Sequence, residues 1–313
     1  MNILDKYSTI SQLSIQMRRG NNKFKGTGVA VVTPFKKSGA IDFEAYERLV
    51  DHVIQGGVDF IVVLGTTGES PTISKPEKKA LIEFSVKVVN KRVPLVVGIG
   101  GNSTSDVVLA IHGTPFKGVD AILSVCPYYN KPPQEGIYQH YKIISEASPV
   151  PVIIYTVPGR TSSNISATTT LRLARDCHNI VGIKDASGNF DQAFQVLKNR
   201  PADFLVLSGD DALTLPLLAS GADGVISVTA NAYPREFSEM VRFALSGNFP
   251  PSRNLHFKLL DFTNALFADG SPAGIKAALE LKQICSSHTR LPLVPVTQDV
   301  QELIKKLIAQ LET

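Results

Sequence analysis

The sequence has few cysteines and no long apolar run. Cys126, Cys177 and Cys285 are too few for a disulfide framework in a chain of 313 residues, and their spacing matches no zinc site. No apolar run approaches the roughly 20 residues that a membrane-spanning helix needs. We therefore expect a protein of the reducing cytoplasm, with neither a membrane segment nor a bound metal.

The net charge of +4 is confined to the start of the chain. Residues 1–25 contain five basic residues against Asp5 alone, so the remaining sequence is electrically balanced. A chain whose remaining charges are balanced lacks the clustered basic residues of a nucleic-acid-binding protein. The first twenty residues also lack the apolar core of a secretory signal. We expect residues 1–25 to be an N-terminal extension, either a disordered tail or a segment upstream of a later start at Met17.

Residues 26–248 alternate short apolar runs with helical patterns. Strand patterns lie at residues 28–35, 60–64, 94–99, 121–125, 152–155, 180–183, 204–207 and 225–228. Their spacing of roughly 20 to 35 residues is that of βα units, and eight such units close into a (β/α)8, or TIM, barrel. The alternative α/β architecture is a doubly wound open sheet. It would carry a glycine-rich dinucleotide fingerprint after an early strand, which this sequence lacks.

The strand pattern ends near residue 250. Residues 255–267, 273–284 and 297–311 have helical periodicity instead. We expect residues 249–313 to form a C-terminal helical region that packs on the barrel.

Lys184 stands at the exit of the apolar run 180–183. Lysine is rarely buried, because desolvation disfavours the charged form of an amine. A neutral amine, in turn, is a nucleophile toward a carbonyl group. Two interpretations are open from this segment alone. The lysine either extends to solvent and pairs with Asp185, or it forms a Schiff base with a substrate.

The other strand ends carry polar groups that meet at one rim of a barrel, the rim where active sites lie. Each group is ambiguous by itself. Gly65-Thr66-Thr67-Gly68 fits an ordinary turn or a carboxylate-binding nest, and Tyr155 fits a core tyrosine. Asp210 and Asp211 are more typical of a helix N-cap than of a metal site. Together, a lysine, tyrosines as proton carriers, an anion nest and an arginine match a Schiff-base aldolase that acts on a 2-keto acid.

Four motifs resemble those of the dihydrodipicolinate synthase / N-acetylneuraminate lyase family. They are Gly65-Thr66-Thr67-Gly68-Glu69-Ser70, Pro127-Tyr128-Tyr129-Asn130, Tyr155-x-x-Pro158-x-Arg160-Thr161 and Gly182-Ile183-Lys184-Asp185. The likeness runs from about residue 26 to the C-terminal helices. It implies a lyase without cofactor that condenses pyruvate with L-aspartate 4-semialdehyde to 4-hydroxy-tetrahydrodipicolinate. That reaction belongs to lysine and diaminopimelate biosynthesis.

The resemblance also implies the catalytic residues. Lys184 would form the pyruvate imine, and Tyr155 would donate and accept protons beside it. Thr66 and Tyr129 would complete a proton relay, with Tyr129 reaching in from a neighbouring subunit. The family forms dimers that usually pair into tetramers, so a homotetramer is expected.

Four further residues are expected to bind the substrates. Thr67 would hold the pyruvate carboxylate, and Gly209 and Ile226 would line the pyruvate site. Arg160 would bind the carboxylate of the semialdehyde, a role that suits a guanidinium fork. The sequence departs from the family pattern at Thr156, where the synthases usually carry asparagine.

Two other functions remain open at this point. One is an aldolase for another 2-keto acid, such as N-acetylneuraminate or a 2-keto-3-deoxy sugar acid, and Arg160 argues against it. The other is a catalytically silent pyruvate-binding regulator, and the intact Lys184 and Tyr155 argue against that.

The resemblance finally implies a cleft between subunits that binds free lysine as a feedback inhibitor. The matching positions are Ser70, Lys75, Lys78, Asn102, Asp106 and Tyr128. Lys75 and Lys78 depart from the family pattern, since the inhibited bacterial enzymes tend to have histidines there. Two fixed positive charges would oppose a cationic ligand, so we expect weak or no inhibition by lysine.

Overall fold

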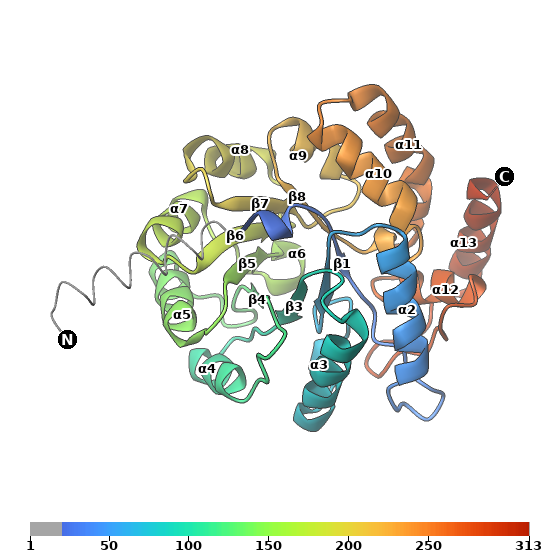
Figure 1. The fold of residues 1–313 in the computed structure, drawn as a ribbon, viewed down its shortest axis with the longest axis horizontal. Coiled ribbons are helices and arrows are strands. Elements are labelled where there is room, and N and C mark those ends of the chain that lie inside the picture. Colours follow the sequence, from blue (N-terminus) through green and yellow to red (C-terminus); the bar gives the residue numbers. More distant parts are fainter. Residues whose placement is uncertain (1–20, 313) are drawn as a thin grey trace, which may run out of the picture.

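The computed structural model describes residues 21–312, and within them eight parallel strands close into a barrel in chain order (Figure 1). The strands are β1 (Gly26–Ala30), β2 (Phe60–Val63), β3 (Leu95–Gly98), β4 (Ala121–Val125), β5 (Val152–Thr156), β6 (Ile180–Asp185), β7 (Leu205–Ser208) and β8 (Gly224–Ser227). β8 pairs with β1 and completes the closure. The predicted TIM barrel is therefore confirmed.

Helices follow the strands and surround the barrel (Figure 1). The longer ones are α2 (Phe43–Gln55), α3 (Lys75–Val89), α4 (Thr104–His112), α5 (Gln134–Ala147), α7 (Ala167–Asp176), α8 (Phe190–Asn199), α9 (Thr214–Ala219) and α10 (Pro234–Leu245). Short turns of helix occur at η2 (Ser70–Thr72), α6 (Pro158–Thr161) and η3 (Thr229–Asn231). None of the helices within residues 21–312 combines the length and the apolar character that crossing a bilayer requires.

A repeated Gly-Val/Ala-Asp sequence fixes the amino ends of three strands. In each copy the glycine has a positive φ and the aspartate accepts a backbone N–H from the preceding strand. The pairs are Asp59 with Thr27 (2.7 Å), Asp120 with Leu95 (2.9 Å) and Asp223 with Val206 (3.0 Å). These carboxylates bind the backbone at the amino-terminal rim of the barrel, whereas active sites of such barrels lie at the opposite, carboxyl-terminal rim.

The expected N-terminal extension over residues 1–25 lies mostly outside the described residues. Its last part, η1 (Asn21–Phe24), is a 3-10 helix whose Phe24 is fully buried. The Phe24 ring meets the Phe60 ring edge-on at 5.8 Å, within the apolar cluster that fills the barrel interior. Phe24 thus belongs to the packed core.

The chain ends in the helices α11 (Phe249–Ala265), α12 (Ala273–Leu281) and α13 (Gln298–Leu311), as the periodicity predicts. α11 packs against α10 and α13, and α12 packs against α13. Between α12 and α13 the chain runs without helix or strand through residues 282–296, here called the C-terminal segment. This segment returns to the carboxyl-terminal rim, which places it beside the candidate site.

Candidate active site

Lys184 and Tyr155 lie side by side at the rim. They are register partners on β6 and β5, and the Lys184 Nζ stands 4.3 Å from the centroid of the tyrosine ring. Both side chains are buried, with 5% and 6% exposure. The lysine therefore does not extend into solvent, and an amine is held against a phenol ring in a largely water-free position.

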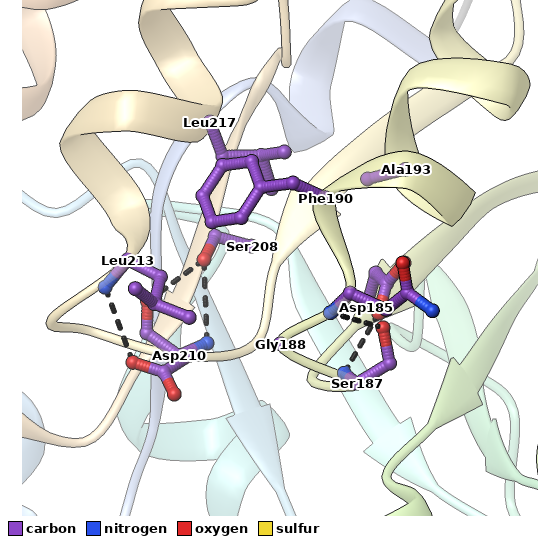
Figure 2. A pocket seen from close by; sticks show the side chains of 10 residues that line it. Asp185, Ser187, Gly188, Phe190, Ala193, Ser208, Asp210, Leu213 and Leu217 are labelled. Carbon is purple, nitrogen blue, oxygen red and sulfur yellow. Dashed lines mark hydrogen bonds between the residues drawn. The ribbon is translucent and has the colours of Figure 1, made fainter.

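Asp185 turns away from Lys184 into the following loop. Its Oδ1 accepts the Ser187 N–H at 2.8 Å, and burial raises the pKa of its carboxyl group. Figure 2 shows Asp185 and Ser187 facing Asp210 and Ser208 across a cavity of about 20 Å³. A cavity of that size has room for about one water molecule, so it is too small for a substrate.

The threonine loop, residues 64–69, carries Thr66 and Thr67 at the end of β2. Its turns close through the Gly68 N–H to the Gly65 carbonyl and the Glu69 N–H to the Thr66 carbonyl, both at 3.1 Å. Leu64 and Glu69, at the two ends of the loop, have φ values of 59° and 56°. Residues other than glycine adopt this left-handed region only when the surroundings enforce it. The loop is therefore held in one defined shape.

A cavity of about 420 Å³ opens above these groups. Three of the predicted catalytic and substrate-binding residues, Thr66, Tyr155 and Arg160, line it together, whereas Lys184 is not part of its lining. Its walls also include Ser271 and Pro272 before α12 and Pro292 and Leu293 of the C-terminal segment. Sequence reasoning missed these C-terminal residues, because an apolar or small residue in an irregular segment gives no signal of a binding site.

The remaining predicted substrate-binding residues do not line this cavity. Thr67 is a buried member of the threonine loop, Gly209 directly follows β7, and Ile226 belongs to the barrel interior on β8. Thr156 is fully buried, and its hydroxyl donates to Asn164 Oδ1 at 3.0 Å. Thr156, at which the sequence departs from the family pattern, thus makes its side-chain hydrogen bond outside the cavity.

Arg160 lies on α6 at the edge of the cavity. Its Nη2 donates to the Ser271 carbonyl at 3.4 Å. The main chain before α12 thereby helps to orient the arginine, and its other N–H donors can address an anion in the cavity.

Tyr129 is not brought together with Thr66 and Tyr155 within one protomer. Its side chain is 87% exposed and its φ is 71°. A large apolar ring held in solvent by a left-handed backbone is costly in an isolated chain. This geometry is compatible with a ring that contacts another subunit.

The N-cap prediction is wrong for Asp211. Its fully buried Oδ2 accepts the N–H groups of Val228 at 2.9 Å and Thr229 at 2.7 Å, and so ties the loop after β8 to the loop after β7. Asp210 comes closer to the expectation, since its Oδ1 accepts the Leu213 N–H just before α9. Across residues 21–312, no group of three or more His, Cys, Asp and Glu side chains is arranged to hold a metal ion.

Three of the six positions of the expected lysine cleft line the same cavity, and the structure does not place the other three in its lining. Ser70, Lys78 and Tyr128 line it, while Asp106 lies in the first turn of α4 and Lys75 begins α3. The Asn102 carbonyl accepts the Asn130 amide at 2.8 Å. Burial and the neighbouring Lys75 lower the pKa of Lys78.

The fold and this rim define a barrel protein with a buried lysine beside a tyrosine at the ends of adjacent strands. The chain belongs to the dihydrodipicolinate synthetase family, whose family model matches residues 23–311. It is 50% identical over 287 residues to the 4-hydroxy-tetrahydrodipicolinate synthase of Parabacteroides distasonis, which covers 92% of this chain and 97% of that protein.

Solved structures agree with this assignment. The dihydrodipicolinate synthase of Thermotoga maritima superposes with a TM-score of 0.91 at 42% identity, covering 93% of this chain and 99% of that one. A chloride-inhibited dihydrodipicolinate synthase of Acinetobacter baumannii, complexed with pyruvate, gives a TM-score of 0.89 at 40% identity over 92% and 99% of the two chains. The predicted family is thus confirmed.

Proposed function

We propose that this protein condenses pyruvate with L-aspartate 4-semialdehyde to 4-hydroxy-tetrahydrodipicolinate, a step of lysine and diaminopimelate biosynthesis in the cytoplasm. The observation that carries the proposal is the Lys184–Tyr155 pair. A buried amine 4.3 Å from the centre of a phenol ring has a proton carrier at hand for each step of imine chemistry. The relatives named as 4-hydroxy-tetrahydrodipicolinate synthases support the choice of substrates.

In the proposed mechanism the Lys184 amine attacks the keto carbon of pyruvate. Tyr155 gives a proton to the departing oxygen, which leaves as water, and an imine forms. Tyr155 then accepts a proton from the methyl group, which gives an enamine. The enamine carbon attacks the aldehyde carbon of the semialdehyde, and the aldehyde oxygen takes up a proton and becomes the 4-hydroxyl group. The amino group of that substrate then displaces Lys184 from the former keto carbon, which closes the ring and frees the enzyme.

The carboxylates of the two substrates require separate anion sites. Thr67 and the N–H groups of the threonine loop would bind the pyruvate carboxylate, as hydroxyls and turn N–H groups do in anion nests. Gly209 and Ile226 would border the pyruvate methyl group. Arg160 would bind the second carboxylate, as its place at the cavity edge allows.

The proton path extends beyond Tyr155. Thr66 lines the cavity with Tyr155 and would pass protons toward Tyr129 of a neighbouring subunit. The exposure of Tyr129 supports this role. We propose a homotetramer built from two such dimers, without a cofactor.

Reductive trapping tests the proposal directly. Incubation with pyruvate and borohydride should leave one adduct on Lys184, because reduction fixes an imine, and Lys184→Ala should remove it. Peptide mapping supplies a built-in control, since Lys276 is a second, fully buried lysine that should stay unlabelled. An adduct on Lys276 instead of Lys184 would refute the mechanism.

A turnover assay separates the two candidate aldolase reactions. Pyruvate and the semialdehyde, coupled to the reductase that consumes the product, should give turnover, whereas N-acetylneuraminate should not be cleaved. The opposite result would assign the chain to the sugar-acid aldolases.

A further inference from the structure

Glu69, which lines the cavity, forms a buried ion pair with Lys276 of α12. Both side chains have 0% exposure, and the Lys276 Nζ contacts Glu69 Oε1. The same Nζ donates to the His288 carbonyl at 2.8 Å, and the Arg290 N–H donates to Glu69 Oε2 at 3.1 Å. The carboxylate of the threonine loop is therefore bound by α12 and by the C-terminal segment at once.

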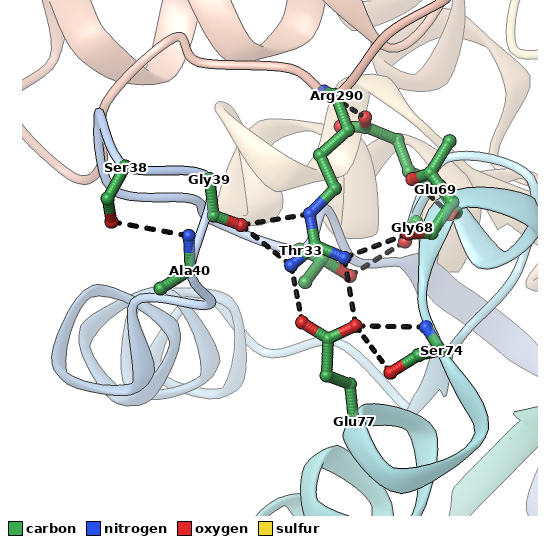
Figure 3. Close-up of polar contacts among 10 residues, drawn as sticks. Thr33, Ser38, Gly39, Ala40, Gly68, Glu69, Ser74, Glu77 and Arg290 are labelled. Atoms are coloured by element: carbon green, nitrogen blue, oxygen red, sulfur yellow. Dashed lines mark hydrogen bonds and ion pairs between the residues drawn. The ribbon is translucent and has the colours of Figure 1, made fainter.

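Arg290 extends this network to two more loops (Figure 3). Its guanidinium donates to the Gly39 carbonyl at 2.6 and 2.9 Å and to the Thr72 carbonyl at 2.8 Å. It also pairs with Glu77 of α3 and so lowers the pKa of that carboxyl group to about 2. Two carboxylates, of Glu69 and Glu77, thus pair with two basic side chains, those of Lys276 and Arg290.

The Phe35 ring contacts both basic side chains of the network, Lys276 and Arg290. The Lys276 Nζ is 4.2 Å from its ring centroid and the Arg290 guanidinium is 4.4 Å from it. Phe35 itself is fully buried. Cation–π contacts of this kind are strongest where water is excluded, so the loop after β1 is fixed to the same network.

The network acts on Thr66 through the backbone of Glu69. Glu69 holds a left-handed φ of 56°, and its N–H donates to the Thr66 carbonyl at 3.1 Å. On the other side of the loop, the Thr33 hydroxyl donates to the Gly68 carbonyl at 2.7 Å. The side chain of Glu69 is the anchor that can keep its own backbone in this unfavourable conformation.

We propose that Glu69 and Lys276 are positioning residues for Thr66, through which the C-terminal region sets the geometry of the proton relay. The inference rests on the proposed function, because it assigns the network a task in that reaction. It differs from a purely stabilising ion pair in one respect. A stabilising pair affects how much protein is folded, whereas a positioning pair affects the turnover of the folded enzyme.

A double-mutant cycle between Glu69→Gln and Thr66→Val tests this. Turnover is measured at saturating substrates and well below the melting temperature of each variant. Glu69→Gln should lower kcat by about tenfold or more, as small misplacements of catalytic groups do. In the Thr66→Val background the same substitution should lower kcat by less than about threefold, because residues acting as one unit are non-additive. Equal losses in both backgrounds, or no loss in the folded single variant, would overturn the inference.

A second variant covers the case in which Glu69→Gln fails to fold. Removing one partner of a buried pair leaves an unpaired charge and is strongly destabilising, whereas removing both is often tolerated. Glu69→Gln/Lys276→Met should therefore fold, with the same loss of kcat and the same coupling to Thr66. Full turnover in this variant would show that the pair only stabilises the fold.

Two controls complete the design. Lys282→Met removes another ion pair of this region, with Glu312, at the end of α12, and kcat should stay unchanged. The pyruvate adduct on Lys184 is trapped in parallel. A native protein without adduct would overturn the proposed function together with the inference, whereas an adduct with uncoupled Glu69 and Thr66 would overturn the inference alone.

Discussion

Gly209 packs against both Ala186 and the Lys184 side chain, which leave no room for a side chain of its own. A Cβ at this position would stand 3.0 Å from the Lys184 Cε and 2.6 Å from the Ala186 Cβ. The lysine chain passes over the bare backbone at the end of β7 on its way to the Tyr155 ring. Glycine is thus required here by the packing of Ala186 and of the lysine chain, independently of any contact with pyruvate.

Gly209→Ala should consequently impair imine formation. The added methyl group forces the lysine chain or the β6 end to shift, and a displacement of about 1 Å at a reacting group can cost roughly a hundredfold in rate. The rate of borohydride-trapped adduct formation measures the effect. Gly113→Ala is the control, since its Cβ would meet nothing closer than 3.4 Å and should leave the rate unchanged. Native rates in Gly209→Ala would show that the contact is not limiting.

Arg160→Ala should affect the binding of the two substrates differently. Loss of a charge-assisted hydrogen bond costs about 1.5–3 kcal/mol, so the apparent affinity for the semialdehyde should fall by roughly tenfold or more. Trapping of the pyruvate imine should continue, because Arg160 lies at the edge of the cavity and Lys184 is buried beside Tyr155. Steady-state kinetics with each substrate varied in turn measure the difference. Unchanged semialdehyde kinetics would contradict the assignment of Arg160.

The sequence predicts the barrel, and with it the rim to which Lys184 and Tyr155 belong, because each residue ends an apolar run and parallel strands end at one edge. It does not predict the contact of Glu69 with Lys276, which are 207 positions apart. Both residues look like ordinary surface charges in a sequence, and only the packed structure buries them. A single chain likewise cannot show what the Tyr129 side chain contacts, because its expected partner is another subunit.

Mixing two inactive variants tests whether Tyr129 acts between subunits. Tyr129→Phe keeps Lys184 but lacks the phenol hydroxyl, while Lys184→Ala keeps the hydroxyl but lacks the nucleophile. In a mixed two-fold dimer one site regains both groups, so random mixing should restore roughly a quarter of native activity. Coexpression followed by the coupled assay measures this. No recovery in verified mixed dimers would place Tyr129 outside the relay.

His140 should make the stability of the protein depend on pH. The imidazole is 4% exposed, its Nδ1 contacts the Thr104 hydroxyl at 2.9 Å, and burial lowers its pKa to about 4. In the unfolded chain the ring takes up a proton near pH 6.5, whereas the folded protein resists it. Well above pH 6.5 this group therefore costs no stability. As the pH falls from 6.5 toward 4, the free energy of unfolding decreases progressively, by up to about 3 kcal/mol from this group.

His140→Phe removes this titration and keeps an aromatic ring against Tyr141, which lies 5.3 Å away. Urea unfolding at pH 7 and pH 5, at one protein concentration, should show a smaller loss of stability in the variant than in the native protein. The same loss in both proteins would assign the acid sensitivity to other groups.

Free lysine should inhibit this protein weakly or not at all. Lys78 lines the large cavity, and its pKa is lowered chiefly by burial and in addition by the neighbouring charge of Lys75. A cationic ligand in this cavity would meet the like charge of Lys78 in a partly enclosed site, where screening by salt is reduced, and Lys75 at the start of α3 would add to the repulsion. Initial rates at saturating pyruvate, titrated with lysine, measure the effect.

The variant Lys75→His/Lys78→His should become more sensitive to lysine. Histidine is mostly neutral above pH 7, so the substitution removes the repulsion while keeping hydrogen-bonding groups in the cleft. Lys79→His on the exposed side of the same helix is the matched control and should leave the inhibition as it is in the native protein. Strong inhibition of the native protein at submillimolar lysine would mean that Lys75 and Lys78 turn away from the ligand, and that their charges do not decide its binding.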